Sequence, residues 1–266
     1  MLNIYFQELK AHRKNIILWS IGMIMLIVMG MAKMSAYQSS GDNINKLFAE
    51  LPRVFKAITG ATGFDLATAK GFFALLFLYI VIMVAIHAVL LGSEIIAKEE
   101  RDKTAEFLLT KPLTRSAILS SKILAGLTLL SVLTVVTLLA SVIIVGAYND
   151  GASITNDITK MMFGMFLIQL IFYIIGIALA TVSKNPRSSS QVGAMIVLVT
   201  YLAYVLVGIF DSLNFLKYVT PFRFFEADAI LNNGYSPTFI LMTLVIILVC
   251  LGVSYKQYPT RDQTLT

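Results

Sequence analysis

Residues 72–92 read FFALLFLYIVIMVAIHAVLLG, an unbroken apolar stretch that contains no Asp, Glu, Lys or Arg. A helix needs roughly 20 mostly apolar residues to cross the hydrocarbon core of a bilayer, which is the length of this stretch. Inside lipid the backbone must satisfy its hydrogen bonds within the segment, and a helix does so. The stretch therefore predicts a transmembrane helix.

Five further stretches are of comparable length and also lack Asp, Glu, Lys and Arg. With residues 72–92 they make six expected spans: 16–32, 72–92, 123–147, 161–182, 191–210 and 238–254. Short segments of alternating polarity, which are typical of a membrane β-barrel, do not occur. The sequence predicts an all-α integral membrane protein that forms one transmembrane domain over residues 1–266.

The composition excludes an ordinary soluble domain. Hydrophobic residues make up 58% of the 266 residues and charged residues 14%, whereas soluble domains contain about 45–50% apolar and about 25% charged residues. The formal net charge of +6 could indicate a nucleic-acid partner, so the positions of the charges decide what it means.

Those charges are distributed unequally between the two sides of the membrane. The segments on the side of the N-terminus contain 13 Lys and Arg and 7 Asp and Glu, and the segments on the other side contain 8 of each kind. Because cytoplasmic loops carry the excess of Lys and Arg, both termini are expected in the cytoplasm. The basic excess thus indicates a multi-pass protein of the cell membrane, in contact with membrane lipids, and no nucleic-acid partner.

The N-terminal residues 2–14, LNIYFQELKAHRK, show helical spacing. Leu2, Phe6 and Leu9 fall near one face, and three basic residues follow toward the lipid surface. This pattern predicts a short interfacial helix that leads into the first span. A frayed basic terminus is the alternative.

The segment between the second and third spans, residues 93–122, carries 11 charged residues among 30. Residues 96–109 fit a short helix, which Pro112 should end, and Thr114 is a suitable N-cap for the next helix. Charges on one face and Phe107, Leu108 and Leu109 on the other suit docking into a groove of another protein. A solvated loop whose charges only set the topology explains the composition equally well.

Two segments on the outer side also show helical patterns. Residues 45–57 have helical spacing with a kink or restart expected at Pro52, and they either cover an exit or form a structural cap. In residues 211–237, Thr220-Pro221 can start a short helix and Asn233-Gly234 can end one. Surface or re-entrant helices are therefore expected before the last span.

The charged segment resembles the first cytoplasmic loop of bacterial ABC-2-type transporter permeases, also called type V exporters. The shared residues are Glu99, Glu100, Arg101, Thr104, Glu106, Leu108, Leu109, Pro112, Thr114, Arg115, Ile118, Leu119 and Lys122. Lys103 stands where the family usually has Gly. Residues 47–60 and 218–234 are similar to the first and last outer segments of the same family, so the resemblance covers essentially the whole chain.

This resemblance implies a permease that pairs with a second, identical or homologous permease. Cytosolic ABC ATP-binding subunits would dock on the short loop helix, known as the coupling helix. The expected contacts are Glu99, Glu100, Arg101, Asp102, Thr104, Glu106, Phe107 and Leu108. The second and fifth spans would line the pathway. The chain has no G-x-x-x-x-G-K-[ST] phosphate-binding loop, so ATP and Mg are expected on the partner subunit and this chain is not expected to be an enzyme.

Other catalytic and metal-binding motifs are missing from the sequence. It contains no H-E-x-x-H, no G-x-S-x-G and no metal-ligand cluster. His87, inside the second span, is either a polar group of a pathway or a neutral histidine hydrogen-bonded to a neighbouring helix. Glu94 is expected to pair with Lys98. The pairs Gly176-x-x-x-Ala180 and Ser189-x-x-x-Gly193 indicate faces of close helix contact.

The leading interpretation is the permease subunit of an ATP-driven exporter that works by alternating access. Because the spans hold so few charges, the expected substrate is hydrophobic or amphipathic: a peptide antibiotic, a drug or a lipid-like molecule. The alternative is a non-transporting membrane anchor for an ATPase in a sensory or regulatory complex. A third hypothesis, an intramembrane enzyme, would require an activity that depends on His87.

Overall fold

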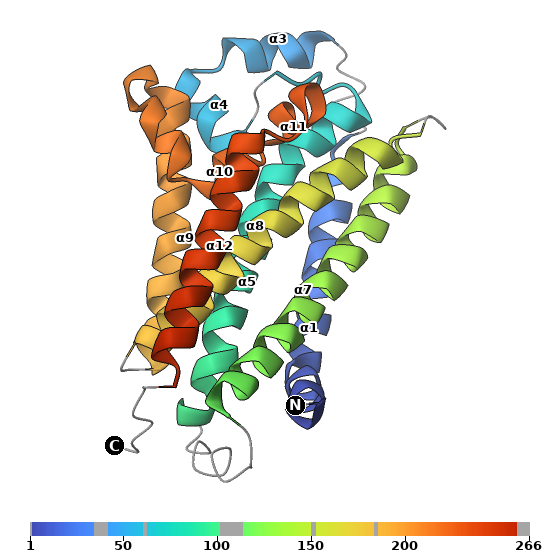
Figure 1. Ribbon diagram of the computed structural model, residues 1–266. Coiled ribbons are helices and arrows are strands. Elements are labelled where there is room, and N and C mark those ends of the chain that lie inside the picture. The colour runs from blue at the N-terminus through green and yellow to red at the C-terminus, as the bar shows by residue number, and fades with distance from the viewer. Residues whose placement is uncertain are drawn as a thin grey trace.

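The computed structural model (Figure 1) describes residues 2–34, 42–60, 63–101, 114–149, 153–183 and 186–259. Within these ranges six helices are long and apolar enough to cross a membrane: α1 (Leu2–Met31), α5 (Ala69–Arg101), α7 (Arg115–Gly146), α8 (Thr155–Val182), α9 (Pro186–Ile209) and α12 (Pro237–Gln257). The start of α1 and the end of α12 lie at the same end of the bundle. The predicted all-α fold with six spans is confirmed.

The centre of the bundle is formed by α5 and α8, which are the most buried of the long helices. They approach so closely that only glycine fits at the crossing. A methyl group at Gly92 would lie 2.2 Å from the carbonyl oxygen of Tyr173, and one at Gly176 would lie 2.4 Å from that of Val89. Gly176, from the first predicted small-residue pair, thus lies on a packing face. Gly193, from the second pair, does so too, because a methyl group added there would lie 2.8 Å from a methyl carbon of Val89.

The first helix, α1, differs from the sequence-based expectation in its length. It runs unbroken from Leu2 to Met31, because no Pro or Gly precedes Gly22 to separate an interfacial helix from the span. Of the three apolar residues near one face, Leu2 is 70% and Phe6 60% exposed, whereas Leu9 packs against the core. The buried face carries Ile4, Glu8 and His12. The buried face at the start of this helix therefore combines one apolar residue with two polar ones.

The outer end of the bundle is covered by short helices (Figure 1): α3 (Asp42–Glu50), α4 (Arg53–Thr59), η1 (Asp211–Tyr218), α10 (Pro221–Phe224) and α11 (Ala227–Asn233). The restart at Pro52, the start at Thr220-Pro221 and the end at Gly234 are confirmed, the last with a φ of 74°. Side chains attach this layer to the spans. Tyr201 donates to the carbonyl oxygen of Ile58 at 3.0 Å.

At the opposite end, α5 continues without a break to Arg101. The predicted start of a separate helix at residue 96 is therefore wrong, because residues 96–101 prolong the second span in one helix. Glu99, Glu100 and Arg101 form its last residues. The other expected contacts lie outside the described residues, namely Asp102, Thr104, Glu106, Phe107 and Leu108. The N-cap at Thr114 is confirmed, since its side chain accepts a hydrogen bond from the backbone N–H of Ala117 at 3.2 Å.

Candidate functional site

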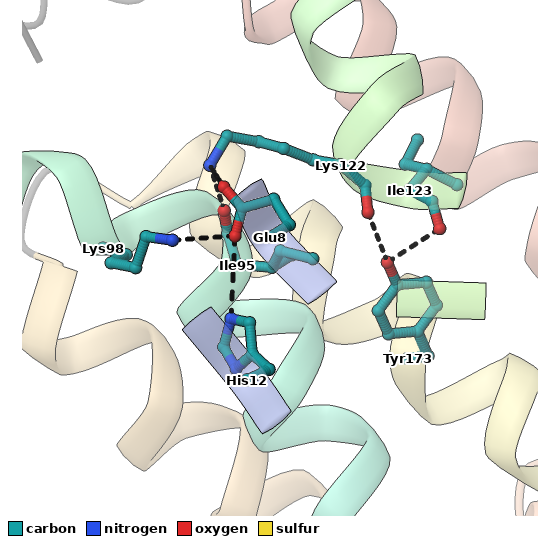
Figure 2. Close-up of polar contacts among 7 residues, drawn as sticks. All are labelled: Glu8, His12, Ile95, Lys98, Lys122, Ile123 and Tyr173. Carbon is teal, nitrogen blue, oxygen red and sulfur yellow. Dashed lines mark hydrogen bonds and ion pairs between the residues drawn. The ribbon is translucent and has the colours of Figure 1, made fainter. Parts of the chain in front are cut away.

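Three helices meet around one carboxylate at the end of the bundle that the Lys and Arg distribution assigns to the cytoplasm (Figure 2). Glu8 of α1 accepts a hydrogen bond from the ammonium group of Lys98, on α5, at 2.8 Å. Its other oxygen accepts from Lys122, on α7, at 3.1 Å. Glu8 is 2% exposed and Lys122 is fully buried. We refer to Glu8, Lys98 and Lys122 as the ion cluster.

Lys122 makes a second contact that joins α7 to α5 directly. Its ammonium group also donates to the backbone carbonyl oxygen of Ile95 at 2.5 Å. A buried ammonium group is tolerated only when it is paired and hydrogen-bonded, because it has lost its water shell. Lys122 meets this requirement through partners on two other helices, and its burial therefore depends on all three helices being in place.

His12 extends the cluster along α1. Its Nε2 atom lies 3.7 Å from the carboxylate of Glu8, one helical turn earlier, and is buried. That separation is too long for a hydrogen bond, and Nε2 has no hydrogen-bond partner within the described residues. The imidazole thus fills space beside the carboxylate without taking a hydrogen-bond position from either lysine.

His87, the polar residue singled out in the second span, also lies between α1 and α5. It is buried, and its ring packs against the indole of Trp19 with 5.0 Å between the ring centroids. Its Nδ1 atom has no hydrogen-bond partner among the residues that the structure describes. His87 therefore contacts the neighbouring helix through the ring of Trp19. A hydrogen bond to a neighbouring helix was one of the two expectations for this residue.

The fourth helix of the site, α8, contributes Tyr173. Its hydroxyl donates to the backbone carbonyl oxygens of Lys122 at 3.3 Å and Ile123 at 3.1 Å (Figure 2). Gly126, one turn further along α7, makes room for this hydroxyl, because a methyl group there would lie 2.0 Å from its oxygen. Tyr173 thus holds the backbone of α7 in the register that places Lys122 against Glu8.

Replacing Tyr173 by Phe should remove this hydroxyl contact and keep the ring. Loss of one net hydrogen bond costs about 0.5–1.5 kcal/mol of the free energy of unfolding, which corresponds to a fall in Tm of about 1–6 °C for a chain of this size. Thermal unfolding of the purified protein in mild detergent measures this shift. Tyr218→Phe, at a half-exposed position on η1, is the control, and equal Tm values for the two variants would contradict the role of the hydroxyl.

The two lysines of the ion cluster flank, in the sequence, the segment that was expected to dock another protein. Lys98 stands three residues before the end of α5, and Lys122 stands within the first turns of α7. Glu8 therefore binds one lysine before and one lysine after residues 99–121. Of the expected contacts, Glu99, Glu100 and Arg101 follow Lys98 directly.

Sequence reasoning missed Glu8 and Tyr173, and assigned Lys98 a partner within its own helix. The available signal was the spacing of Ile4, Glu8 and His12 at every fourth residue, which places all three on one helical face. Within the described residues, no group of three or more His, Cys, Asp or Glu could hold a metal ion. The ion cluster therefore joins α1, α5 and α7 by salt bridges.

Comparison with known proteins identifies a family that matches nearly the whole chain. A family model described as "ABC-2 family transporter protein" matches residues 2–263. The matched range contains all six long helices and every residue of the ion cluster. A search of curated proteins finds no match.

Proposed function

Because the chain belongs to the ABC-2 family of transporter proteins, we propose that this multi-pass permease is the membrane subunit of an ATP-driven exporter. Separate cytosolic ATP-binding subunits dock on residues 99–108, and ATP and Mg bind to them. The sequence has no phosphate-binding loop of its own, which supports this division of labour. The ion cluster around Glu8 is the observation that carries the proposal.

The cluster links the docking segment to the bundle. Moving α5 or α7 away from α1 would separate Glu8 from one of its lysines. Breaking a buried ion pair costs about 3–5 kcal/mol, because the remaining charge is left uncompensated. It is therefore cheaper for the cytoplasmic ends of α1, α5 and α7 to move together. Closure of the ATP-binding subunits on residues 99–108 would then move three spans as one body, and we propose that this joint movement drives alternating access.

The pathway and the cargo follow from the family and from the apolar character of the spans. We place the pathway along α5 and α9, at the interface with a second copy or a homologous permease. The cargo is hydrophobic or amphipathic: a peptide antibiotic, a drug or a lipid-like molecule.

Reversing Glu100 and Asp102 to Lys tests the docking role. We expect normal insertion into the membrane and loss of the ATP-binding subunit from a mild-detergent pull-down, together with loss of stimulated ATP hydrolysis, because the basic surface would repel the cations that the carboxylates attract. The control is the Glu50→Lys/Asp211→Lys variant, which adds the same charge at the outer end. Wild-type assembly and hydrolysis in the Glu100/Asp102 variant would refute the docking role.

The same preparation separates an exporter from a non-transporting anchor. Permease and ATP-binding subunits are reconstituted in vesicles with a fluorescent amphiphile. ATP-dependent movement of the amphiphile across the bilayer supports the exporter. Intact docking and ATP hydrolysis without movement of any tested amphiphile would favour the anchor of a sensory or regulatory complex.

A further inference from the structure

A groove of about 570 Å³ lies between the first turns of α1 and the first half of α7. Figure 1 shows the start of α1 beside this part of α7. Along α7 the groove extends from Ser120 to Ser131, or about 16 Å at 1.5 Å per residue. This is about half of the roughly 30 Å hydrocarbon thickness, so the groove follows the inner leaflet. Its volume falls in the range of small-molecule sites, about 300–1,000 Å³.

The groove is lined by three leucines and five hydroxyl-bearing residues, without any charged side chain. Three leucines form the apolar part, and two of them are open to the surroundings, with Leu2 70% and Leu124 56% exposed. The polar part is five hydroxyl groups, those of Tyr5, Ser120, Ser121, Thr128 and Ser131. The chemistry of the groove therefore depends on whether these hydroxyls offer hydrogens or lone pairs.

Three of the hydroxyls use their hydrogens within α7. Ser121 donates to the carbonyl oxygen of Ala117 at 2.8 Å, Ser131 to that of Leu127 at 2.9 Å, and Thr128 to that of Leu124 at 3.0 Å. A hydroxyl has one hydrogen and two lone pairs. These three groups can therefore offer only lone pairs to the groove.

The remaining two hydroxyls are determined by their neighbours. The Tyr5 and Thr128 oxygens lie 2.9 Å apart, and either could donate; we assign Tyr5 as the donor, because the Thr128 hydroxyl also contacts the carbonyl oxygen of Leu124. Ser120 donates to the carbonyl oxygen of Ser116 at 3.0 Å, and we therefore assign Tyr255 as the donor in its contact of 2.7 Å with Ser120, in which either hydroxyl could donate. With these donations made, all five lining hydroxyls present oxygen lone pairs to the groove.

We propose that this groove binds, from the inner leaflet, an amphiphile whose polar part carries amide N–H donors. The leucines receive its apolar chain, and the hydroxyl oxygens accept from its N–H groups. The lining carries no charged side chain that could pair with an ionic head. Lys122, next to Ser121, offers no free charge because its ammonium group is held by Glu8 and Ile95. This inference rests on the proposed function in making the amphiphile the transported cargo; its binding does not require transport.

The test measures binding to the full chain in phosphatidylcholine nanodiscs, whose head groups carry no hydrogen-bond donor. Two fluorescent probes are compared: an N-palmitoyl dipeptide amide, and its analogue in which ester oxygens replace the amide N–H groups. We expect the amide to bind about tenfold more tightly, as two net hydrogen bonds imply. Equal affinity of the two probes would overturn the proposal.

Two variants locate the site. Leu124→Trp fills the groove from an exposed position and should abolish binding of the amide. Thr128→Val/Ser131→Ala removes two acceptors and should lower amide affinity about tenfold while leaving the ester unchanged. Ser141→Ala is the control, because Ser141 makes the same kind of bond, to Thr137, outside the groove. Unchanged amide affinity in Leu124→Trp would place the bound probe elsewhere and overturn the proposal.

Binding is measured on the chain without ATP-binding subunits, so it is independent of the docking test. If the protein binds the amide but recruits no ATPase, the proposed groove ligand is supported and the proposed exporter function is refuted. If the protein recruits the ATPase but binds the two probes equally, the proposed exporter function is supported and the proposed groove ligand is refuted. Each variant is compared only when its Tm and elution profile match those of the wild type.

Discussion

Replacing Glu8 by Ala is expected to lower the free energy of unfolding by about 3–5 kcal/mol, because it leaves a buried charge without its partner. Lys122 is fully buried, and although it would keep its hydrogen bond to the carbonyl oxygen of Ile95, it would lose its carboxylate. Lys98 is less affected, since its side chain is partly exposed and can turn toward water. The loss at Lys122 should therefore dominate.

The measurement is thermal unfolding of the purified permease in mild detergent, where a fall in Tm of about 10 °C is expected for a chain of this size. Glu8→Ala/Lys122→Met should recover much of the loss, because removing both charges of a buried pair is far less costly than removing one. Glu50→Ala, at an exposed position on α3, is the control. A single Glu8→Ala variant as stable as this control would show that the cluster does not hold the helices together.

Replacing Gly176 by Leu should prevent α5 and α8 from packing as they do. The first added carbon would lie 2.4 Å from the carbonyl oxygen of Val89 and 3.0 Å from the backbone nitrogen of Ser93. Both neighbours are backbone atoms, which cannot rotate away, so the two central helices must separate. Overpacking usually costs about 1–3 kcal/mol when side chains can adjust, and we expect a cost at or above the upper limit here.

The yield of monodisperse protein after solubilisation measures this effect, with Tm for any fraction that folds. Gly252→Leu is the matched control: Gly252 also lies within a spanning helix, α12, but an added carbon there meets nothing within 4 Å. The control should behave like the wild type. Equal yields and Tm values for the two leucine variants would mean that the close approach of α5 and α8 is not required.

The amino-acid sequence determined the features that depend on local chemistry. Length and apolarity define a span, because each segment must satisfy its backbone inside lipid regardless of its neighbours. The restart at Pro52 and the N-cap at Thr114 were predictable for the same reason, since a fixed φ angle and a side-chain cap act within one turn. The expected docking contacts from Glu99 to Leu108 came from the family resemblance, and they stay predictions.

Only the tertiary structure decided which face of α1 is buried and what surrounds it. The pattern of Leu2, Phe6 and Leu9 indicated an apolar face, but in a membrane protein such a face can point to lipid as well as to the bundle. Glu8 is buried because Lys98 and Lys122 meet it from two other helices, 90 and 114 residues away in the chain. No local period encodes that meeting. It arises from the close packing of α5 and α8 and from the hold of Tyr173 on α7, and these set where each charge can find a partner.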